Sequence, residues 1–267
     1  MEYRNITVTV DEAIATLTLA RTERLNALNR ALCEEIIDAM GEISGRSDVR
    51  AVVVTSAARI FSAGIDLTDM MSQGLDTKPG ALLAMPDTYG YLFACTNAFE
   101  TCRKPVIAAV NGACIGGGLD IITACDIRLC SRDAEFSLRE AAIGLVADMG
   151  VLQRLPMIVG QGYAREMAYT AGNYDAEAAL RMGLVNRVYD TADACRDGAY
   201  MLARAIAANA PLAVQETKDI LNRGRDIPVE DGMSLARHKN MVLMQSQDLM
   251  EAAAAFMQKR PPAFTGE

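Results

Sequence analysis

The sequence predicts an α/β fold built from repeated strand–turn–helix units. Two short apolar segments, Ala51–Thr55 and Val106–Val110, are typical of strands buried on both faces of a sheet. Each is followed by glycines and then by residues at helical spacing, over 51–70 and 106–124. Strands that alternate with helices favour an α/β architecture. A chain of 267 residues is long enough to bury a sizeable core.

The first fifty residues predict a β-hairpin and a helix. Ile6–Val10 and Ala13–Ala20 are rich in Val, Ile and Thr, and a polar turn separates them. Asn29 can cap the helix, because apolar residues then recur at helical spacing: Leu32, Ile36, Ile37, Met40 and Ile43.

The middle of the chain alternates between loop, helix and strand signals. Ser72–Pro86 is rich in Gly, Pro and polar residues and predicts a mobile loop. Tyr89–Cys102 predicts a helix, which Pro105 brings to an end. A helix is expected at Gly116–Ala124, and strands are expected at 127–130 and 135–138.

After Gly150 the chain becomes largely helical. One short strand, Leu184–Val188, interrupts this pattern. The helical tail is expected to pack on the core or on a neighbouring subunit. The expected helices cover 149–158, 162–170, 175–182, 191–209, 211–223, 229–246 and 248–258.

Composition argues against several classes of protein. The formal net charge is −8, whereas nucleic-acid binders usually carry a basic face. The seven cysteines are odd in number and form no CxxC pair, so neither a disulfide framework nor a zinc ribbon is indicated. His238 is the one histidine, which rules out a His-rich metal site. No metal is expected.

The sequence also carries no targeting or membrane signal of an ordinary kind. MEYRNITVTV lacks the basic and apolar regions of a signal peptide, and the C-terminal residues are no peroxisomal address. The longest apolar run, 106–130, is interrupted by glycines and polar residues and makes a poor membrane span. A cytoplasmic protein with no membrane partner is therefore expected.

Glycines and carboxylates gather between residues 104 and 150. Gly112 and Gly116–Gly118 interrupt an apolar segment, and Asp120, Glu140 and Asp148 follow in mostly apolar surroundings. Carboxylates in such surroundings are costly unless they are paired or used in chemistry. Two glycine turns that each open a helix could direct two backbone N–H groups at one oxygen and form an oxyanion hole.

Other interpretations of the glycines remain. They could bind a phosphate or a nucleotide, or they could only allow tight packing. The spacing matches neither GxGxxG nor GxxxxGK[ST], which disfavours the nucleotide alternative.

Several motifs together resemble the enoyl-CoA hydratase/isomerase (crotonase) superfamily. They are FSAGIDL at 61–67, KPVIAAVNGACIGGGLD at 104–120 and the segment 134–150, with support from 26–29, 170–188 and 255–260. The resemblance implies a spiral of ββα units over residues 1–195 and a C-terminal helical trimerisation region over 196–267. It also implies a homotrimer or homohexamer and an acyl-CoA thioester substrate, with no cofactor beyond the coenzyme A of that substrate.

The resemblance also assigns binding residues. The oxyanion hole would use the backbone N–H groups of Ile65 and Gly117. Coenzyme A would contact a set of residues near the first glycine turn, and a tail lysine of the same or a neighbouring subunit would reach its phosphates. That set is Arg24, Leu25, Ala27, Ala63 and Ile65, and the lysine is Lys259. Taken alone, Arg24 and Lys259 are ordinary surface cations.

The three carboxylates indicate which reaction to expect. Asp120 and Glu140 match the two catalytic acids of crotonase-type hydratases, but Asp148 stands where a hydratase has glycine. The triplet resembles the Δ3,5-Δ2,4-dienoyl-CoA isomerases of the superfamily, which act in the degradation of unsaturated fatty acids. By this resemblance Asp148 is the C2 base, Glu140 is the C6 acid, and Asp120 helps Glu140 to keep its proton.

Alternative roles remain for each acid and for the protein. Asp120 could act only on the dipole of a helix, Glu140 could be a solvated helix-start residue, and Asp148 could cap the next helix. The protein could also be a 2-enoyl-CoA hydratase, another crotonase-family isomerase, or a non-catalytic binding protein of the same fold, such as one that binds RNA. Net charge disfavours the last alternative.

Overall fold

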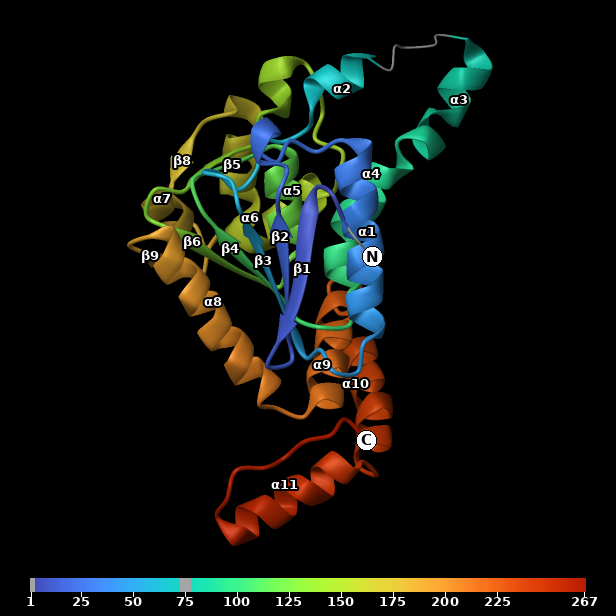
Figure 1. Ribbon diagram of the computed structural model, residues 1–267. Helices are drawn as coiled ribbons and strands as arrows, with labels where there is room; N and C mark the ends of the chain where they lie inside the picture. Colours follow the sequence, from blue (N-terminus) through green and yellow to red (C-terminus); the bar gives the residue numbers. More distant parts are fainter. Residues whose placement is uncertain (1–2, 73–77) are drawn as a thin grey trace.

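A six-stranded sheet forms the centre of the protein (Figure 1). The structure is a computed structural model that describes residues 3–72 and 78–267. The strand order is β1-β2-β3-β4-β6-β9, and only the β1–β2 pair is antiparallel. The strands are β1 (Ile6–Asp11), β2 (Ile14–Leu19), β3 (Ala51–Ser56), β4 (Val106–Val110), β6 (Ile127–Ser131) and β9 (Arg187–Tyr189). The predicted hairpin and buried parallel strands are confirmed.

A second, smaller sheet lies beside the first. It contains β5 (Ala113–Ile115), β7 (Glu135–Ser137) and β8 (Tyr174–Asp175). An isolated bridge between Ser62 and Cys114 extends this sheet to the segment that follows β3. Two strands and a helix thus recur along the chain, which confirms the predicted spiral of ββα units. The sequence analysis missed β5 and β8 because two or three residues carry no readable alternation.

Helices cover both faces of the large sheet (Figure 1). One face carries α1 (Arg30–Gly45), α4 (Gly90–Thr101) and α5 (Gly117–Ala124), whose apolar residues join the main core. The other face carries α8 (Ala192–Ala207), which packs on alternate residues of the strands. The predicted cap of α1 is present: the Asn29 side chain accepts a hydrogen bond from the Leu32 N–H, at 3.0 Å.

The prediction of a loop over Ser72–Pro86 is wrong for its second half. Helix α2 spans Leu67–Ser72 and helix α3 spans Pro79–Thr88, while residues 73–77 lie outside the described part of the chain. Proline is well tolerated in the first turn of a helix, and the residues after Pro79 include the strong helix formers Ala, Leu and Met. The Gly and Pro content of the stretch concealed this helix.

Two predicted helices after Gly150 are one bent element. Helix α6 runs over Val151–Thr170, and Gly160 breaks its regular geometry with a φ of 78° and a ψ of 163°. The break lies between the predicted segments 149–158 and 162–170. Helix α7 (Ala176–Arg181) follows, and the strand expected at 184–188 begins three residues later and ends one residue later, as β9.

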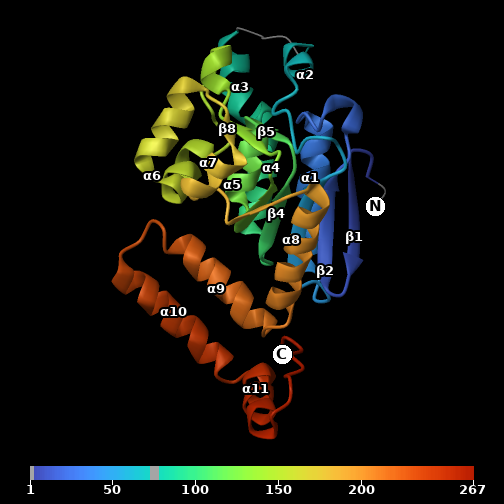
Figure 2. The same cartoon turned by 90° about the vertical axis from the view of Figure 1, so that its left-hand side faces the viewer.

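The last three helices extend away from the core (Figure 2). They are α9 (Pro211–Arg223), α10 (Val229–Leu243) and α11 (Gln247–Gln258). The expected division at 195/196 falls inside α8, which packs on the sheet, and α9 also contacts the core, because its buried Lys218 donates to the carbonyls of Phe99 and Lys104. No helix within the described residues is long and apolar enough to cross a membrane.

Candidate active site

The two glycine turns lie against each other, as the sequence analysis expected. Leu28 pairs with Ile65: its N–H donates to the Gly64 carbonyl at 2.7 Å, and its carbonyl accepts from the Asp66 N–H at 2.9 Å. Gly64 has a φ of +91°, and a Cβ there would lie only 3.0 Å from the carbonyl oxygen of Ile115, which directly precedes the second glycine turn. The absence of a side chain at Gly64 therefore lets the two turns approach closely.

The geometry leaves two backbone donors free at this junction. Because Leu28 bonds to the residues on either side of Ile65, the N–H of Ile65 points away from Leu28. Gly117 is the first residue of α5, where the N–H groups have no partner within the helix. Within residues 3–72 and 78–267 neither N–H donates to a protein acceptor. This arrangement can stabilise negative charge on one oxygen.

Asp120 lies in the first turn of α5 and is 1% exposed. Its Oδ1 accepts a hydrogen bond from the Val151 N–H at 2.8 Å. The pKa of Asp120 rises from 3.8 to about 7, chiefly because of burial and also because of the charges of Glu140 and Asp148, against the opposing effect of the Val151 bond. Asp120 thus interacts with the Val151 N–H and with two other acids as well as with the dipole of α5. Its raised pKa lets it hold a proton near neutral pH.

Glu140 begins the 3₁₀-helix η2 (Glu140–Ile143) and is 8% exposed. A Cβ at Gly116 would meet the Glu140 Oε1 at 3.0 Å, so this carboxyl lies against the second glycine turn. Its Oε2 is buried without a hydrogen-bond partner among the described residues. Burial raises the pKa of Glu140, and the charge of Asp148 adds to this effect. The alternative of a solvated helix-start residue is therefore wrong.

Asp148 is more exposed than the other two acids, and it lies three residues before the start of α6. Partial burial raises the pKa of its carboxyl. Gly150 is the N-cap of α6, and the Val151 N–H at the start of this helix donates to Asp120 and not to Asp148, so the alternative in which Asp148 acts as a cap is wrong. The structure brings the three carboxylates into one electrostatic cluster, since the charge of Asp148 acts on both of the others.

The residues expected to bind coenzyme A lie beside the first glycine turn. Arg24 is exposed at the end of the short helix η1 (Thr22–Arg24), and Leu25 adopts a left-handed conformation with a φ of 52°. The carbonyl of Leu25 accepts a hydrogen bond from the N–H of Ala63 at 3.0 Å. Ala27 is half-buried between them. The structure therefore gathers Arg24, Leu25, Ala27 and Ala63 next to Ile65.

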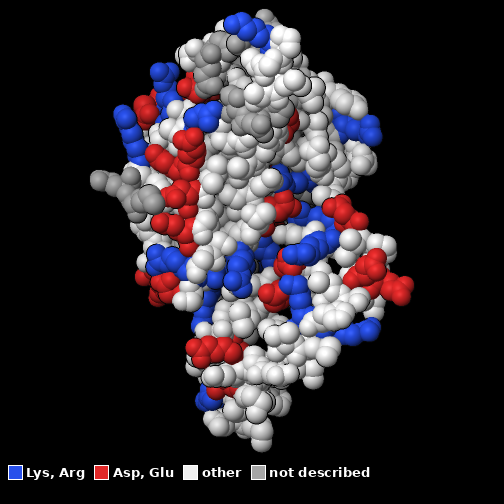
Figure 3. All heavy atoms as spheres, turned by 90° about the vertical axis from the view of Figure 1, so that its right-hand side faces the viewer, with Lys and Arg blue, Asp and Glu red and all other residues white. Residues whose placement is uncertain are grey.

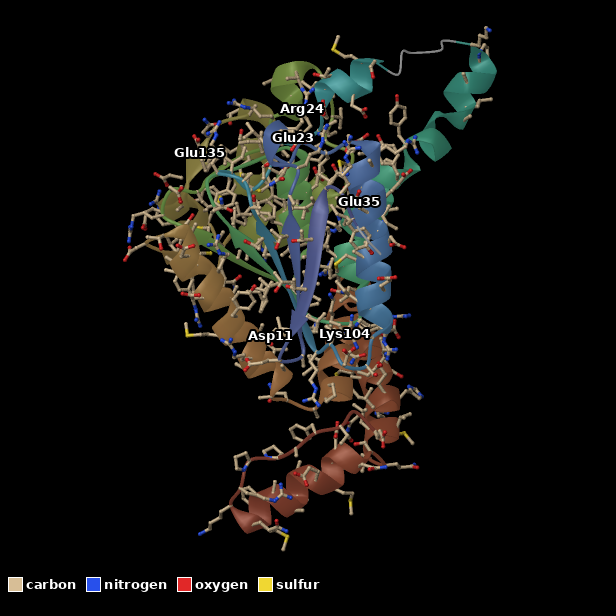
Figure 4. All side chains as sticks on the ribbon, viewed as in Figure 1. Asp11, Glu23, Arg24, Glu35, Lys104 and Glu135 are labelled. Atoms are coloured by element: carbon tan, nitrogen blue, oxygen red, sulfur yellow. The ribbon has the colours of Figure 1, made fainter. Side chains whose placement is uncertain are left out.

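Lys259 is not part of this cluster within one chain. It ends α11, which lies at the opposite end of the molecule from Arg24 (Figure 4). Any contact between Lys259 and a ligand held at Arg24 would have to come from another copy of the chain.

The sequence analysis missed an ion pair that supports the first glycine turn. Arg21 donates to the Asp66 carboxylate at 2.7 Å and to the Ala27 carbonyl at 2.7 Å, and both side chains are largely buried. The other oxygen of Asp66 accepts from the N–H groups of Thr68 and Asp69 and caps α2. The pair therefore fixes the direction of the backbone at Ile65. Its two members are 45 residues apart, so no local pattern reveals them.

Two further observations bear on what the protein binds. Within the described residues no group of three or more His, Cys, Asp or Glu side chains could hold a metal ion. On the face drawn in Figure 3, acidic side chains gather in a band along one side and basic side chains elsewhere lie among acidic ones, so the described residues form no broad basic patch there. A cavity of about 790 Å³ lies between α9 and the core, and it is lined by other residues than the three carboxylates.

A sequence model of the enoyl-CoA hydratase/isomerase family matches residues 9–267. The chain belongs to this family. It is an enzyme, as predicted, and the crotonase-type fold inferred from its motifs is confirmed. An enoyl-CoA hydratase from Bacillus anthracis superposes with a TM-score of 0.91 at 29% identity, covering 99% of this chain and all of that one.

Relatives within the family include both isomerases and hydratases. A mitochondrial Δ(3,5)-Δ(2,4)-dienoyl-CoA isomerase from Mus musculus is 40% identical over 97% of this chain and 81% of its own length. A peroxisomal protein of the same name from Arabidopsis thaliana is 39% identical over 95% of this chain and 93% of its own. A short-chain-enoyl-CoA hydratase from Clostridium acetobutylicum is 34% identical over 97% of both chains.

The expectation of a cytoplasmic location is contradicted by these relatives, because the dienoyl-CoA isomerases are named as mitochondrial or peroxisomal proteins. The expectation rested on the lack of a targeting signal. Targeting signals are short segments that the catalytic fold does not require, so their absence was a weak argument.

Proposed function

We propose that the protein isomerises 3,5-dienoyl-CoA thioesters to 2,4-dienoyl-CoA thioesters. The observation that carries the proposal is the third carboxylate, Asp148, which joins the buried pair Asp120 and Glu140 beside two free backbone donors. The identity of about 40% to dienoyl-CoA isomerases supports the same activity. No metal or redox cofactor takes part in the proposed reaction.

The reaction moves one proton onto the substrate and one away from it. The Asp148 carboxylate removes a proton from C2, and the electron pair moves into the thioester carbonyl to form a dienolate. The N–H groups of Ile65 and Gly117 hold the oxygen, an interaction worth about 3 to 4 kcal/mol for a donor of this kind. Glu140 then donates its proton to C6, and the double bonds settle at C2 and C4.

The environments of the acids suit these roles. Asp148 is the most exposed of the three, so its carboxylate is the easiest to ionise and use as a base. Glu140 is buried and its pKa is raised, which favours the protonated form that an acid requires. The pKa of about 7 at Asp120 means that the pair Asp120 and Glu140 retains a proton close to neutral pH. After turnover, exchange with solvent restores the starting protonation states.

The coenzyme A part of the substrate is proposed to lie along η1 and the first glycine turn. Arg24 supplies an exposed positive charge there for a phosphate group. Leu25, Ala27 and Ala63 provide small or apolar contacts for the pantetheine chain, next to Ile65, where the thioester oxygen would sit. Lys259 could add a second positive charge only from a neighbouring subunit.

A trimer, or a hexamer made of two trimers, is also proposed. One reason is that Lys259 could reach the ligand only from a neighbouring subunit, and the second is the apolar surface of the C-terminal helices. The helices α10 and α11 carry many large apolar side chains that are at least 60% exposed in a single chain, which is more than a stable monomer usually leaves in water. They include Met233, Met241, Val242, Met244, Met250, Phe256 and Met257.

The residue roles can be tested with two isosteric substitutions. Asp148→Asn removes the C2 base and Glu140→Gln removes the C6 acid, and each is expected to lower kcat for a 3,5-dienoyl-CoA by about 10²- to 10⁴-fold. With C2-deuterated substrate, Glu140→Gln is expected to wash deuterium out of C2 into solvent without forming product, whereas Asp148→Asn should retain it. Full activity in both variants would refute the assignment.

A 2-enoyl-CoA hydratase is the second candidate, because Asp120 and Glu140 alone match what that reaction uses and a hydratase relative is 34% identical. A hydratase does not require Asp148. Rapid hydration of a 2-enoyl-CoA that persists in Asp148→Asn would therefore favour this candidate.

A further inference from the structure

The turn that follows Asp148 is held by side chains far from it in the sequence. Thr96, on α4, is fully buried, and its hydroxyl lies 2.8 Å from the carbonyl oxygen of Met149, closer than the 3.1 Å to the Phe93 carbonyl of its own helix. Arg154, on α6, donates to the same carbonyl from its guanidinium at 3.3 Å. One carbonyl oxygen, directly after the proposed C2 base, thus lies within hydrogen-bond distance of two buried donors.

The guanidinium of Arg154 is itself fixed. It is 7% exposed, forms an ion pair with Glu100 at 2.5 Å, and donates to the Asn97 side chain at 2.6 Å. Glu100 and Asn97 both belong to α4, so this helix anchors Arg154 as well as supplying Thr96. A buried, multiply bonded guanidinium loses little freedom when it makes one more bond.

The backbone of the turn is shaped to receive this contact. Gly150 has a φ of +107°, and a Cβ at this position would collide with the Arg154 guanidinium. On the other side of the turn, the Val151 N–H donates to Asp120 at 2.8 Å. The segment from Met149 to Val151 is therefore fixed at consecutive backbone groups, while the exposed Asp148 carboxylate has no hydrogen bond to another side chain within residues 3–72 and 78–267.

We propose that Thr96 and Arg154 are positioning residues that hold the Asp148 carboxylate at C2 of the substrate. Neither side chain needs to contact the substrate. They act by fixing the carbonyl of Met149, and through it the direction in which the preceding residue presents its side chain. This inference rests on the proposed role of Asp148 as the C2 base.

A network of contacts extends this support to the C-terminal helices. Arg225, just beyond α9, forms a second ion pair with Glu100, and the Asn222 side chain donates to the Glu100 carbonyl at 3.1 Å. Glu100 therefore binds cations on two sides, one from α6 and one from the segment after α9. The position of the proposed base thereby depends on how the C-terminal helices dock.

The test compares Thr96→Val with Thr96→Ser. Valine matches threonine in shape but leaves the Met149 carbonyl with one donor fewer, whereas serine keeps the hydroxyl. Thr101→Val is the control: this hydroxyl, also on α4, donates to the Asn97 carbonyl of its own helix and, within the described part of the chain, to no residue of another element. Arg154→Met provides a second, independent loss of a donor to the Met149 carbonyl.

The expected result is a loss of kcat by about ten- to a hundred-fold in Thr96→Val and in Arg154→Met, since a displacement of about 1 Å can cost that much. KM should change little, and Thr96→Ser and Thr101→Val should stay near wild type. The primary isotope effect with C2-deuterated substrate should grow in Thr96→Val, because removal of the C2 proton becomes slower. A loss of folded enzyme lowers the apparent rate without changing that isotope effect.

Two failures can be told apart. If the wild-type protein does not convert a 3,5-dienoyl-CoA, the proposed function fails. If the wild-type protein does convert it, and Thr96→Val and Arg154→Met both keep the wild-type kcat and isotope effect, the positioning role is refuted while the function stands.

Discussion

Replacing Asp120 by asparagine should change how the stability of the protein depends on pH. The carboxyl is buried and its pKa rises from 3.8 to about 7 in the folded protein. In the unfolded chain Asp120 ionises near pH 4, but in the folded protein it resists ionisation until about pH 7. Below pH 4 the carboxyl is protonated in both states, so it does not change the free energy of unfolding. As the pH rises towards 7, only the unfolded chain gains free energy from ionisation, so the folded protein becomes less stable.

The size of this effect follows from the pKa. One unit corresponds to about 1.4 kcal/mol, so a rise from 3.8 to about 7 corresponds to at most about 4 kcal/mol. Asparagine keeps an oxygen that can accept the Val151 N–H but carries no charge at any pH. The free energy of unfolding of Asp120→Asn relative to wild type should therefore improve between pH 4 and pH 8, by up to that amount.

Urea unfolding at a fixed protein concentration, at pH 4 and at pH 8, measures this difference. Any cost of the amide group that does not depend on pH cancels between the two conditions. Asp197→Asn, which removes an exposed carboxylate on α8, is the control and should show little difference. A relative stability of Asp120→Asn that is the same at both pH values, or worse at pH 8, would refute the account of Asp120 as a buried group that resists ionisation.

Three further substitutions test the glycine turns and their support. Gly118→Ala would place a Cβ 2.9 Å from the Ser62 side chain and 3.3 Å from the Ser62 carbonyl oxygen, so it should push the two turns apart and lower kcat by about ten-fold or more. A steady-state assay on folded protein checks this prediction, and an unchanged kcat would contradict it. Asp66→Asn leaves the buried Arg21 without its ion pair and should destabilise the protein by about 3 kcal/mol at pH 7. Because Arg21 lowers the pKa of Asp66, the wild-type ion pair weakens below pH 4, and the loss of stability in Asp66→Asn should shrink there. Urea unfolding above and below pH 4 measures this, and a loss of stability that is the same at both pH values would contradict it. Arg24→Gln should raise KM for acyl-CoA several-fold and leave kcat nearly unchanged, because its proposed partner lies far from the reacting carbons; a fall in kcat alone would contradict that position.

The sequence predicted the fold where local patterns are strong. The buried strands over 51–55 and 106–110 and the helix over 211–223 appear within a residue or two of the expected bounds, since continuous apolar runs and helical spacing are long enough to recognise. It failed for α3, where Gly and Pro suggested a loop, and for β5 and β8 of the small sheet, which are held by partners distant in the sequence, whereas β7 lies where a strand was expected.

The candidate site shows the same division. The glycines, the three acids and the residues around Arg24 could be predicted, because each lies in a compact motif. The residues that hold them in place could not. Arg21 pairs with Asp66 across 45 positions, and Thr96 reaches the Met149 carbonyl across 53, so only the folded chain brings them together.

The most direct test of the account is to add purified protein to a 3,5-dienoyl-CoA and follow the ultraviolet absorbance of the conjugated 2,4-dienoyl thioester, with a 2-enoyl-CoA as a parallel substrate. The account predicts rapid appearance of the conjugated product, its near loss in Asp148→Asn, and little hydration of the 2-enoyl-CoA. No conjugated product, together with fast hydration that survives Asp148→Asn, would contradict it and identify the protein as a hydratase.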